Sequence, residues 1–204
     1  MAIATYSELK SSLEVWLNRE GDTSLIPVIP DFISLAEAQI ARDVRHWRQE
    51  KRVTTTVNEQ YENLPIDWLG MIQIQLTGGG KLQVISASEL QDRKQSSQTP
   101  NKPRFYRLTA DQIELYPVPD TGYEVSMQYY ARVPALTDSD SQNWILTEYP
   151  DVYLYGALIH AAPYLLDDSR LNVWATLYQN AVQALNKDNE QSRVSGPFVI
   201  GVAR

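Results

Sequence analysis

The chain has 204 residues and a mass of 23.2 kDa, which suits one domain or one domain carrying a large insertion. Hydrophobic residues make up 43% of it, so we expect a packed core rather than global disorder. The 18 basic and 25 acidic residues give a net charge of −7, which argues against a protein that wraps nucleic acid by releasing counterions. Cysteine is absent, which excludes disulfides, thiolate nucleophiles and cysteine-type zinc sites.

Residues 1–20 do not read as a signal peptide, because they lack a basic start and charged side chains interrupt every apolar run. No stretch approaches the ~18 apolar residues of a membrane span. We therefore expect neither export by a recognisable signal nor a membrane partner. Twelve Tyr and five Trp stand against three Phe, and aromatic side chains with a polar group suit half-buried surfaces and interfaces.

The first fifty residues predict two helices. Thr5 and Glu8 match a capping box, and Gly21 lies just past the last apolar repeat of the first helix. Pro30 opens the second helix, where a proline in the first turn costs no hydrogen bond. The apolar stripe of this second helix continues to Trp47.

At Lys51 the hydrophobic period changes from 3.6 to 2, which predicts a series of strands. A glycine run at 78–80 predicts a hairpin turn, and residues 88–94 predict a short helix. The predicted strands cover residues 52–57, 61–64, 71–76, 82–85, 104–108, 112–116 and 123–132.

Helices return at Pro150, and Pro163 must end or kink the first of them. Asp167, Asp168 and Ser169 offer N-caps for the last helix. The helices at both ends of the chain have one apolar face each, so we expect them to pack together. The prediction is an α+β fold with three parts: a helical bundle from residues 1–50 and 148–192, a β-rich insertion at 51–147, and an extended C-terminal arm at 193–204.

Catalytic and metal-binding patterns are weak. His46 and His160 lie in different predicted helices and read as core or helix-face histidines. The glycine run before Lys81 lacks the spacing of a phosphate-binding loop. The adjacent pair Asp167 and Asp168 could serve a glycosidase, but helix capping explains it. We expect no catalytic residues, no metal site and no cofactor.

Charge is distributed unevenly along the chain. Residues 81–107 hold six cations against two acids, with Phe105 and Tyr106 placed where they could stack on bases. Residues 133–169 hold no Lys or Arg but six acids. The net charge favours a solvated or subunit-facing patch over a nucleic-acid site. Many monomers are polarised in this way by chance, and the alternative is head-to-tail contact in a ring, where opposite charges meet. The cations are Lys81, Arg93, Lys94, Lys102, Arg104 and Arg107.

Several sequence blocks, in this order, resemble a known family. They are LPIDWL at 64–69, PRFYR at 103–107, YPVPD at 116–120, PALTD at 134–138, NWILTEYPDVYLYGAL at 143–158 and AAPYLLDD at 161–168, followed by Trp174, Tyr178 and SRVSG at 192–196. Together they are similar to the head-to-tail adaptor proteins of short-tailed and related tailed bacteriophages, also called head completion or connector proteins. The resemblance covers nearly the whole chain, and residues 143–168 are its most specific part.

The resemblance implies a helical bundle with a β-rich insertion and an extended C-terminal arm. It also implies a ring, usually of twelve subunits, below the portal, and no transferable catalytic residues. We therefore expect a structural protein of the virion neck, present in the host cytoplasm during assembly. It would seal the portal protein, bind a tail nozzle or tail tube protein, and let DNA pass without specific binding.

Two alternatives stay open at this point. One is a cell-wall glycosidase that uses Asp167 or Asp168. The other is a β module of the tail that binds carbohydrate through exposed Tyr and Trp side chains.

Two surfaces are expected to matter for an adaptor. The first is the arm, whose apolar side chains have nothing local to pack against; fully extended it would reach about 40 Å, and the resemblance implies that it binds the portal. The second is a set of acids that could face the channel lumen, because a wall that neutralised phosphates would hold the DNA. The arm residues are Arg193, Phe198, Val199, Ile200, Val202 and Arg204, and the acids are Asp138, Asp140 and Glu148.

Overall fold

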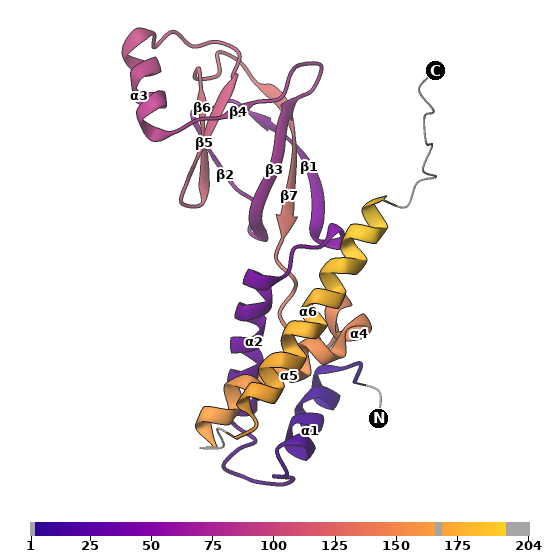
Figure 1. The fold of residues 1–204 in the computed structure, drawn as a ribbon. Coiled ribbons are helices and arrows are strands. Elements are labelled where there is room, and N and C mark those ends of the chain that lie inside the picture. Colours follow the sequence, from indigo (N-terminus) through magenta and orange to yellow (C-terminus); the bar gives the residue numbers. More distant parts are fainter. Residues whose placement is uncertain (1–2, 166–168, 195–204) are drawn as a thin grey trace, which may run out of the picture. The chain divides into compact units, whose positions relative to one another are not determined.

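The computed structural model describes residues 3–165 and 169–194 of the chain. The fold is α+β, as predicted, with helices near both ends and strands between them (Figure 1). Contacts divide the chain into two compact units. The helical unit comprises the described residues up to Trp47 and from Val133 onward, and the β unit comprises residues 48–132.

The helical unit begins with two helices, α1 (Tyr6–Trp16) and α2 (Ile29–Asp43). The predicted capping box is present: the Thr5 hydroxyl accepts a hydrogen bond from the Glu8 backbone at 3.3 Å, and the Glu8 carboxylate accepts one from the Thr5 backbone at 2.9 Å. The prediction that the second helix continues to Trp47 is wrong. The chain turns extended at Val44, whose β-branched side chain is fully buried just beyond the helix.

Three helices complete this unit: α4 (Trp144–Glu148), α5 (Pro150–Tyr164) and α6 (Leu171–Val194). The sequence analysis missed α4, because five residues are too few to show a helical period. The Asn143 side chain caps it by accepting from the Leu146 backbone at 3.0 Å. Pro163 lies in the last turn of α5, which ends at the next residue, in line with the expected stop.

Helix α5 lies at the centre of the bundle and contacts α1, α2, α4 and α6. Its neighbours come so close at Gly156 that an added Cβ would lie 3.2 Å from the Ala36 Cβ and 3.3 Å from the Tyr178 Cε2. The two ends of the chain therefore pack together, as predicted. Leu136 and Ile145 are buried in the same core, so the segment before α5 belongs with the helices rather than with the strands.

The β unit consists of two sheets. The first is antiparallel, in the order β1-β7-β3, and the second has the order β2-β6-β5-β4. Alternate residues Val125, Met127 and Tyr129 of β7 are buried on one face, as the period of two predicted. The strands are β1 (Glu50–Val57), β2 (Tyr61–Asn63), β3 (Trp68–Leu76), β4 (Gln83–Val84), β5 (Phe105–Thr109), β6 (Gln112–Tyr116) and β7 (Tyr123–Ala131).

The glycine run forms the predicted hairpin turn, with Gln75 and Lys81 paired antiparallel across it, but the pairing is short. Gly78 takes the left-handed backbone conformation, with φ at +69°, and the Leu82 backbone donates to Ile74 at 2.9 Å, so the chain does reverse there. However, β3 and β4 belong to different sheets, and β4 pairs in parallel with β5. Strand β3 also begins at Trp68, earlier than predicted, because Pro65 already lies in the preceding turn. Helix α3 (Ala87–Ser96), capped by Ser86, fits the predicted short helix but is longer.

Candidate interaction surfaces

Glu114 organises the interior of the second sheet. It is 4% exposed, and its carboxylate accepts hydrogen bonds from Lys94 at 2.5 Å, from the Tyr61 hydroxyl at 3.0 Å and from the Gln60 amide at 3.0 Å. Arg107 lies 3.7 Å away. Burial by itself raises the pKa of Glu114, but the hydrogen bonds from these donors outweigh it and lower the pKa below the ordinary value. The only sequence signal for this cluster is an acid inside an otherwise apolar strand.

Phe105 and Tyr106 do not form the base-stacking surface that the sequence suggested. Tyr106 is buried in the β-unit core. Phe105 is half-buried, and the Arg93 guanidinium lies over its ring with Cζ 4.0 Å from the centroid. Arg93 also pairs with Glu89 at 2.9 Å. This part of the basic stretch is therefore committed to contacts within the unit.

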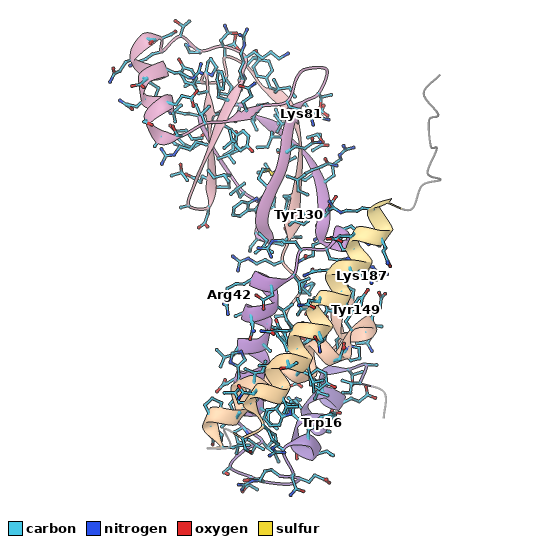
Figure 2. All side chains as sticks on the ribbon, in the orientation of Figure 1. Trp16, Arg42, Lys81, Tyr130, Tyr149 and Lys187 are labelled. Atoms are coloured by element: carbon cyan, nitrogen blue, oxygen red, sulfur yellow. The ribbon has the colours of Figure 1, made fainter. Side chains whose placement is uncertain are left out.

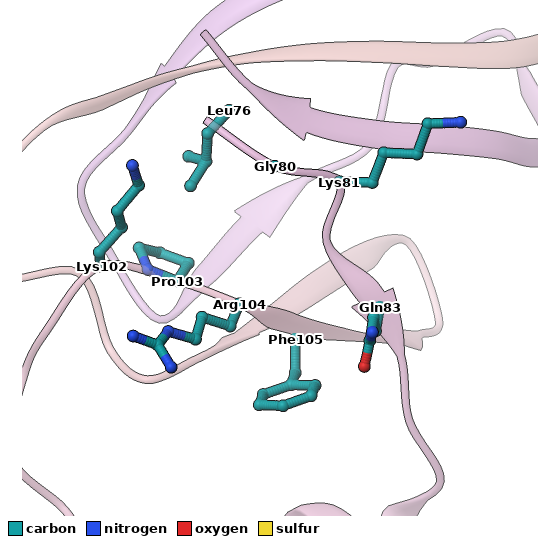
Figure 3. A pocket seen from close by; sticks show the side chains of 8 residues that line it. All are labelled: Leu76, Gly80, Lys81, Gln83, Lys102, Pro103, Arg104 and Phe105. Carbon is teal, nitrogen blue, oxygen red and sulfur yellow. The ribbon is translucent and has the colours of Figure 1, made fainter. Parts of the chain in front are cut away.

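Three cations of the basic stretch line a shallow hollow of about 400 Å³ at the glycine turn (Figure 3). Lys81, Lys102 and Arg104 have no ion pair within the part of the chain that the structure describes. Figure 3 shows that Lys81 points away from Lys102 and Arg104. The Lys102 ammonium lies close to Gly79, so that a Cβ added to Gly79 would be 3.0 Å from the Lys102 Nζ. Leu76, Pro103 and Phe105 supply apolar lining.

The acids proposed for the channel wall lie in the helical unit and have different surroundings. Asp138 pairs with Lys10 at 2.8 Å, although its side chain stays 85% exposed. Glu148, at the end of α4, is exposed and has an interaction of its own. Asp140 is exposed, and its carboxylate has no hydrogen bond or ion pair among residues 3–165 and 169–194. Whether any of the three faces a channel stays a prediction.

Both histidines have structural surroundings, as expected. His46 is fully buried, with its ring centroid 4.9 Å from that of Trp144 and its Nε2 3.6 Å from the Asp188 carboxylate. His160 lies 3.1 Å from the Gln39 side-chain oxygen, and burial lowers the pKa of its imidazole. Within the described ranges, no cluster of His, Asp and Glu side chains could hold a metal ion.

Exposed aromatic side chains do not gather on the β unit, as a carbohydrate-binding module would require. Of those strongly exposed in the described part of the chain, Trp16, Trp47 and Tyr164 belong to the helical unit and Tyr61 to the β unit. Trp16 lies near the end of α1 (Figure 2). The candidate glycosidase pair Asp167 and Asp168 lies outside the described residues.

Of the six residues expected in the C-terminal arm, only Arg193 is described. It is exposed, lies in the last turn of α6 and makes an interaction there, so the helix runs further than the predicted end at 192. Phe198, Val199, Ile200, Val202 and Arg204 lie outside the described residues.

A search of curated proteins finds no match to this chain. The model of one protein family, described as SU10 adaptor protein, matches residues 4–201. No helix among the described residues is long and apolar enough to cross a membrane. The match spans both units, so the chain belongs to this family of bacteriophage head-to-tail adaptor proteins, whose role is structural.

Proposed function

We propose that this protein forms a ring beneath the phage portal and connects the head to the tail. The observation that carries the proposal is the family match over residues 4–201, which includes the helical unit, the β unit and most of the expected arm. The family's structural role favours this function over the glycosidase and carbohydrate-binding alternatives. The resemblance described above implies a ring that usually has twelve copies. Each copy would contact the portal, a tail component and two neighbours.

The helical unit offers surfaces for such contacts. It exposes large apolar side chains on α1, α2 and α6, namely Val15, Trp16, Leu35 and Val173. A single exposed apolar side chain is ordinary. An exposed aromatic side chain such as Trp16, however, suits contact with another protein. We expect part of this surface to be covered by neighbouring copies in the ring.

We propose that the portal contact is made by the C-terminal arm. Residues 197–204 contain four large apolar side chains and no acid. This composition is unusual for a chain terminus that is free in solvent, because such termini are mostly polar. Such a segment could add as an edge strand or lie in a groove between portal subunits, which would satisfy its backbone and its side chains.

Deletion of residues 197–204 tests this contact. We expect a folded protein, with the circular dichroism and the solution mass of the intact chain, that no longer binds purified portal rings in a sedimentation assay. The matched control keeps the length of the arm and replaces Phe198, Val199, Ile200 and Val202 by Ser; it should fail to bind as well. Unchanged binding by both variants would place the portal contact elsewhere.

We also propose that the channel wall is net acidic or mixed, because Lys and Arg along it would hold the DNA by releasing counterions. The helical unit is the anionic part of the chain and is the natural source of such a wall. Rings assembled on portal should bind duplex DNA weakly at low salt. Tight binding that falls steeply with salt would contradict an acidic wall.

A further inference from the structure

The hollow at the glycine turn of the β unit combines cationic side chains with an apolar lining. Lys102 and Arg104 line this hollow and have no ion pair among the described residues (Figure 3). The lining between and beside them is apolar, from Leu76, Pro103 and Phe105. Arginine next to apolar and aromatic surface is typical of the centre of a protein–protein interface.

The acidic loop at 137–140 has the complementary character. The Thr137 backbone donates to the Asp140 carbonyl at 3.0 Å, and the Asp140 backbone donates to the Thr137 hydroxyl at 2.9 Å, so the turn is closed on itself. Its two ends are fastened as well. The Leu136 backbone donates to the Glu37 carboxylate at 2.7 Å before the loop, and the Tyr6 backbone donates to the Ser141 carbonyl at 2.7 Å after it.

This loop therefore presents the Asp140 carboxylate on a fixed backbone. Its companion Asp138 is already paired with Lys10, which leaves Asp140 as the carboxylate of the turn without a partner among the residues described. A preorganised loop loses little conformational entropy when it binds.

The net charge of the chain is divided unevenly between the two units. The β unit has ten basic and ten acidic residues and is neutral overall, whereas the rest of the chain has eight basic and 15 acidic residues and carries the whole net charge of −7. A head-to-tail ring requires two different patches, one on each side of the subunit, that fit each other.

We propose that the hollow formed by Lys102 and Arg104 binds the acidic loop at 137–140 of a second copy of this chain, with Arg104 and Lys102 pairing with Asp140. The proposal rests on the ring of the proposed function and names one of its subunit contacts. It assigns Asp140 to that contact and leaves Asp138 and Glu148 as candidates for the channel wall.

A DNA backbone fits the hollow less well than a protein loop does. Proteins that hold DNA by its phosphates use many cations along a groove or stripe, whereas Lys94, Arg107 and Arg93 are already paired inside the unit. The apolar lining would gain nothing from phosphates.

Cross-linking tests the contact directly, because the chain has no cysteine and any introduced thiol is unique. Arg104→Cys and Asp140→Cys proteins are mixed, assembled on portal rings, checked by electron microscopy and treated with a short bismaleimide. We expect covalent dimers in the mixture and none with either variant alone. The matched control replaces Arg104→Cys by Arg52→Cys, an exposed cation of the same unit outside the hollow, and should give no dimer.

Charge reversal provides a second readout. We expect Arg104→Glu to lower ring assembly roughly tenfold or more, because like charges would then meet across the contact. Adding Asp140→Arg to it should restore assembly, and Arg52→Glu should assemble like the unmodified protein. Circular dichroism verifies that each variant is folded.

The outcomes separate this inference from the proposed function. If the unmodified protein forms no ring on portal, the ring itself is wrong and the contact falls with it. Intact rings without a cross-link between Arg104→Cys and Asp140→Cys overturn the contact alone. Rings that assemble normally with Arg104→Glu but lose salt-dependent DNA binding would assign the hollow to DNA instead.

Discussion

The helical unit and the β unit differ in what their interiors contain. In the helical unit a central apolar helix, α5, is surrounded by other helices, and the polar side chains buried among the described residues, Ser12, His46 and Asn143, include no carboxylate. The β unit has two small sheets with a smaller hydrophobic cluster, and it buries a carboxylate, Glu114, among cations and hydroxyl donors. The helical unit should therefore be most sensitive to changes of volume, and the β unit to the loss of polar partners.

Charge separates the two units in the same way. The β unit contains the cations of the basic stretch, and several of them are used internally by Glu114 and Glu89. The excess of acids belongs to the helical unit, where most of them are exposed. In the β unit, Arg93, Lys94 and Arg107 therefore serve the fold, whereas the proposed contact uses Lys102 and Arg104.

The largest expected effect tests the tight packing around α5. Gly156→Val would place branched carbon atoms against Ala36 of α2 and Tyr178 of α6, neither of which can move without shifting its helix. We expect a loss of about 3 kcal/mol in the free energy of unfolding, measured by urea denaturation. Gly70→Val is the matched control, since no atom lies within 4 Å of an added Cβ there. Equal stability of the two variants would mean that the bundle is looser than described.

A smaller effect tests the polar interior of the β unit. Glu114→Gln keeps the volume but removes the charge that Lys94 and Arg107 face, and we expect a loss of about 1–2 kcal/mol in the free energy of unfolding. Glu59→Gln is the control, because Glu59 is exposed. A Glu114→Gln protein as stable as the control would show that the cluster is not needed for the fold.

The cluster also predicts the direction of a pH dependence. The pKa of Glu114 is lower in the folded protein than its ordinary value of 4.5, so its ionised form contributes stability above that pH. This contribution is lost as the pH falls through the folded-state pKa. In acid, the intact protein should therefore lose more stability than Glu114→Gln, and the difference between them should shrink.

The smallest effect concerns the surface of the first sheet. Lys51 donates a hydrogen bond to Asp67 at 2.5 Å, which lowers the pKa of the carboxyl; partial burial opposes this shift, and the Tyr129 hydroxyl, 2.8 Å away, supports it. Because Lys51 is exposed and Asp67 is only partly buried, Lys51→Met should change the free energy of unfolding by well under ~1 kcal/mol. It should still raise the pKa of Asp67, as measured by NMR titration. An unchanged pKa would mean that the ion pair is absent in solution.

Burial is the main cause that raises the pKa of Tyr129 to about 12, and the Asp67 carboxylate adds to it. The period of two along residues 123–132 puts Tyr129 on one face with Val125 and Met127, but no sequence pattern connects it with Asp67. The two residues belong to segments that are distant in sequence and meet only because β3 and β7 are paired.

Local signals predicted the elements that depend on them. The capping box at Thr5, the proline that starts α5 and the alternation along β7 act through neighbouring residues, so they can be found without a tertiary structure. The class of fold follows from the order of these elements. Most of the surfaces proposed for assembly were also visible, as stretches of one charge sign or as an apolar terminus.

What the tertiary structure alone decided is which partners each residue meets. Six cations are grouped in the sequence, but only folding shows that Lys94 and Arg107 face Glu114 whereas Lys102 and Arg104 line the hollow. Folding also pairs β4 in parallel with β5 rather than with β3. The hydrogen bonds within the acidic loop, which present Asp140, likewise form only in the folded chain. These outcomes depend on contacts between residues far apart in the chain, whose energies a local pattern does not contain.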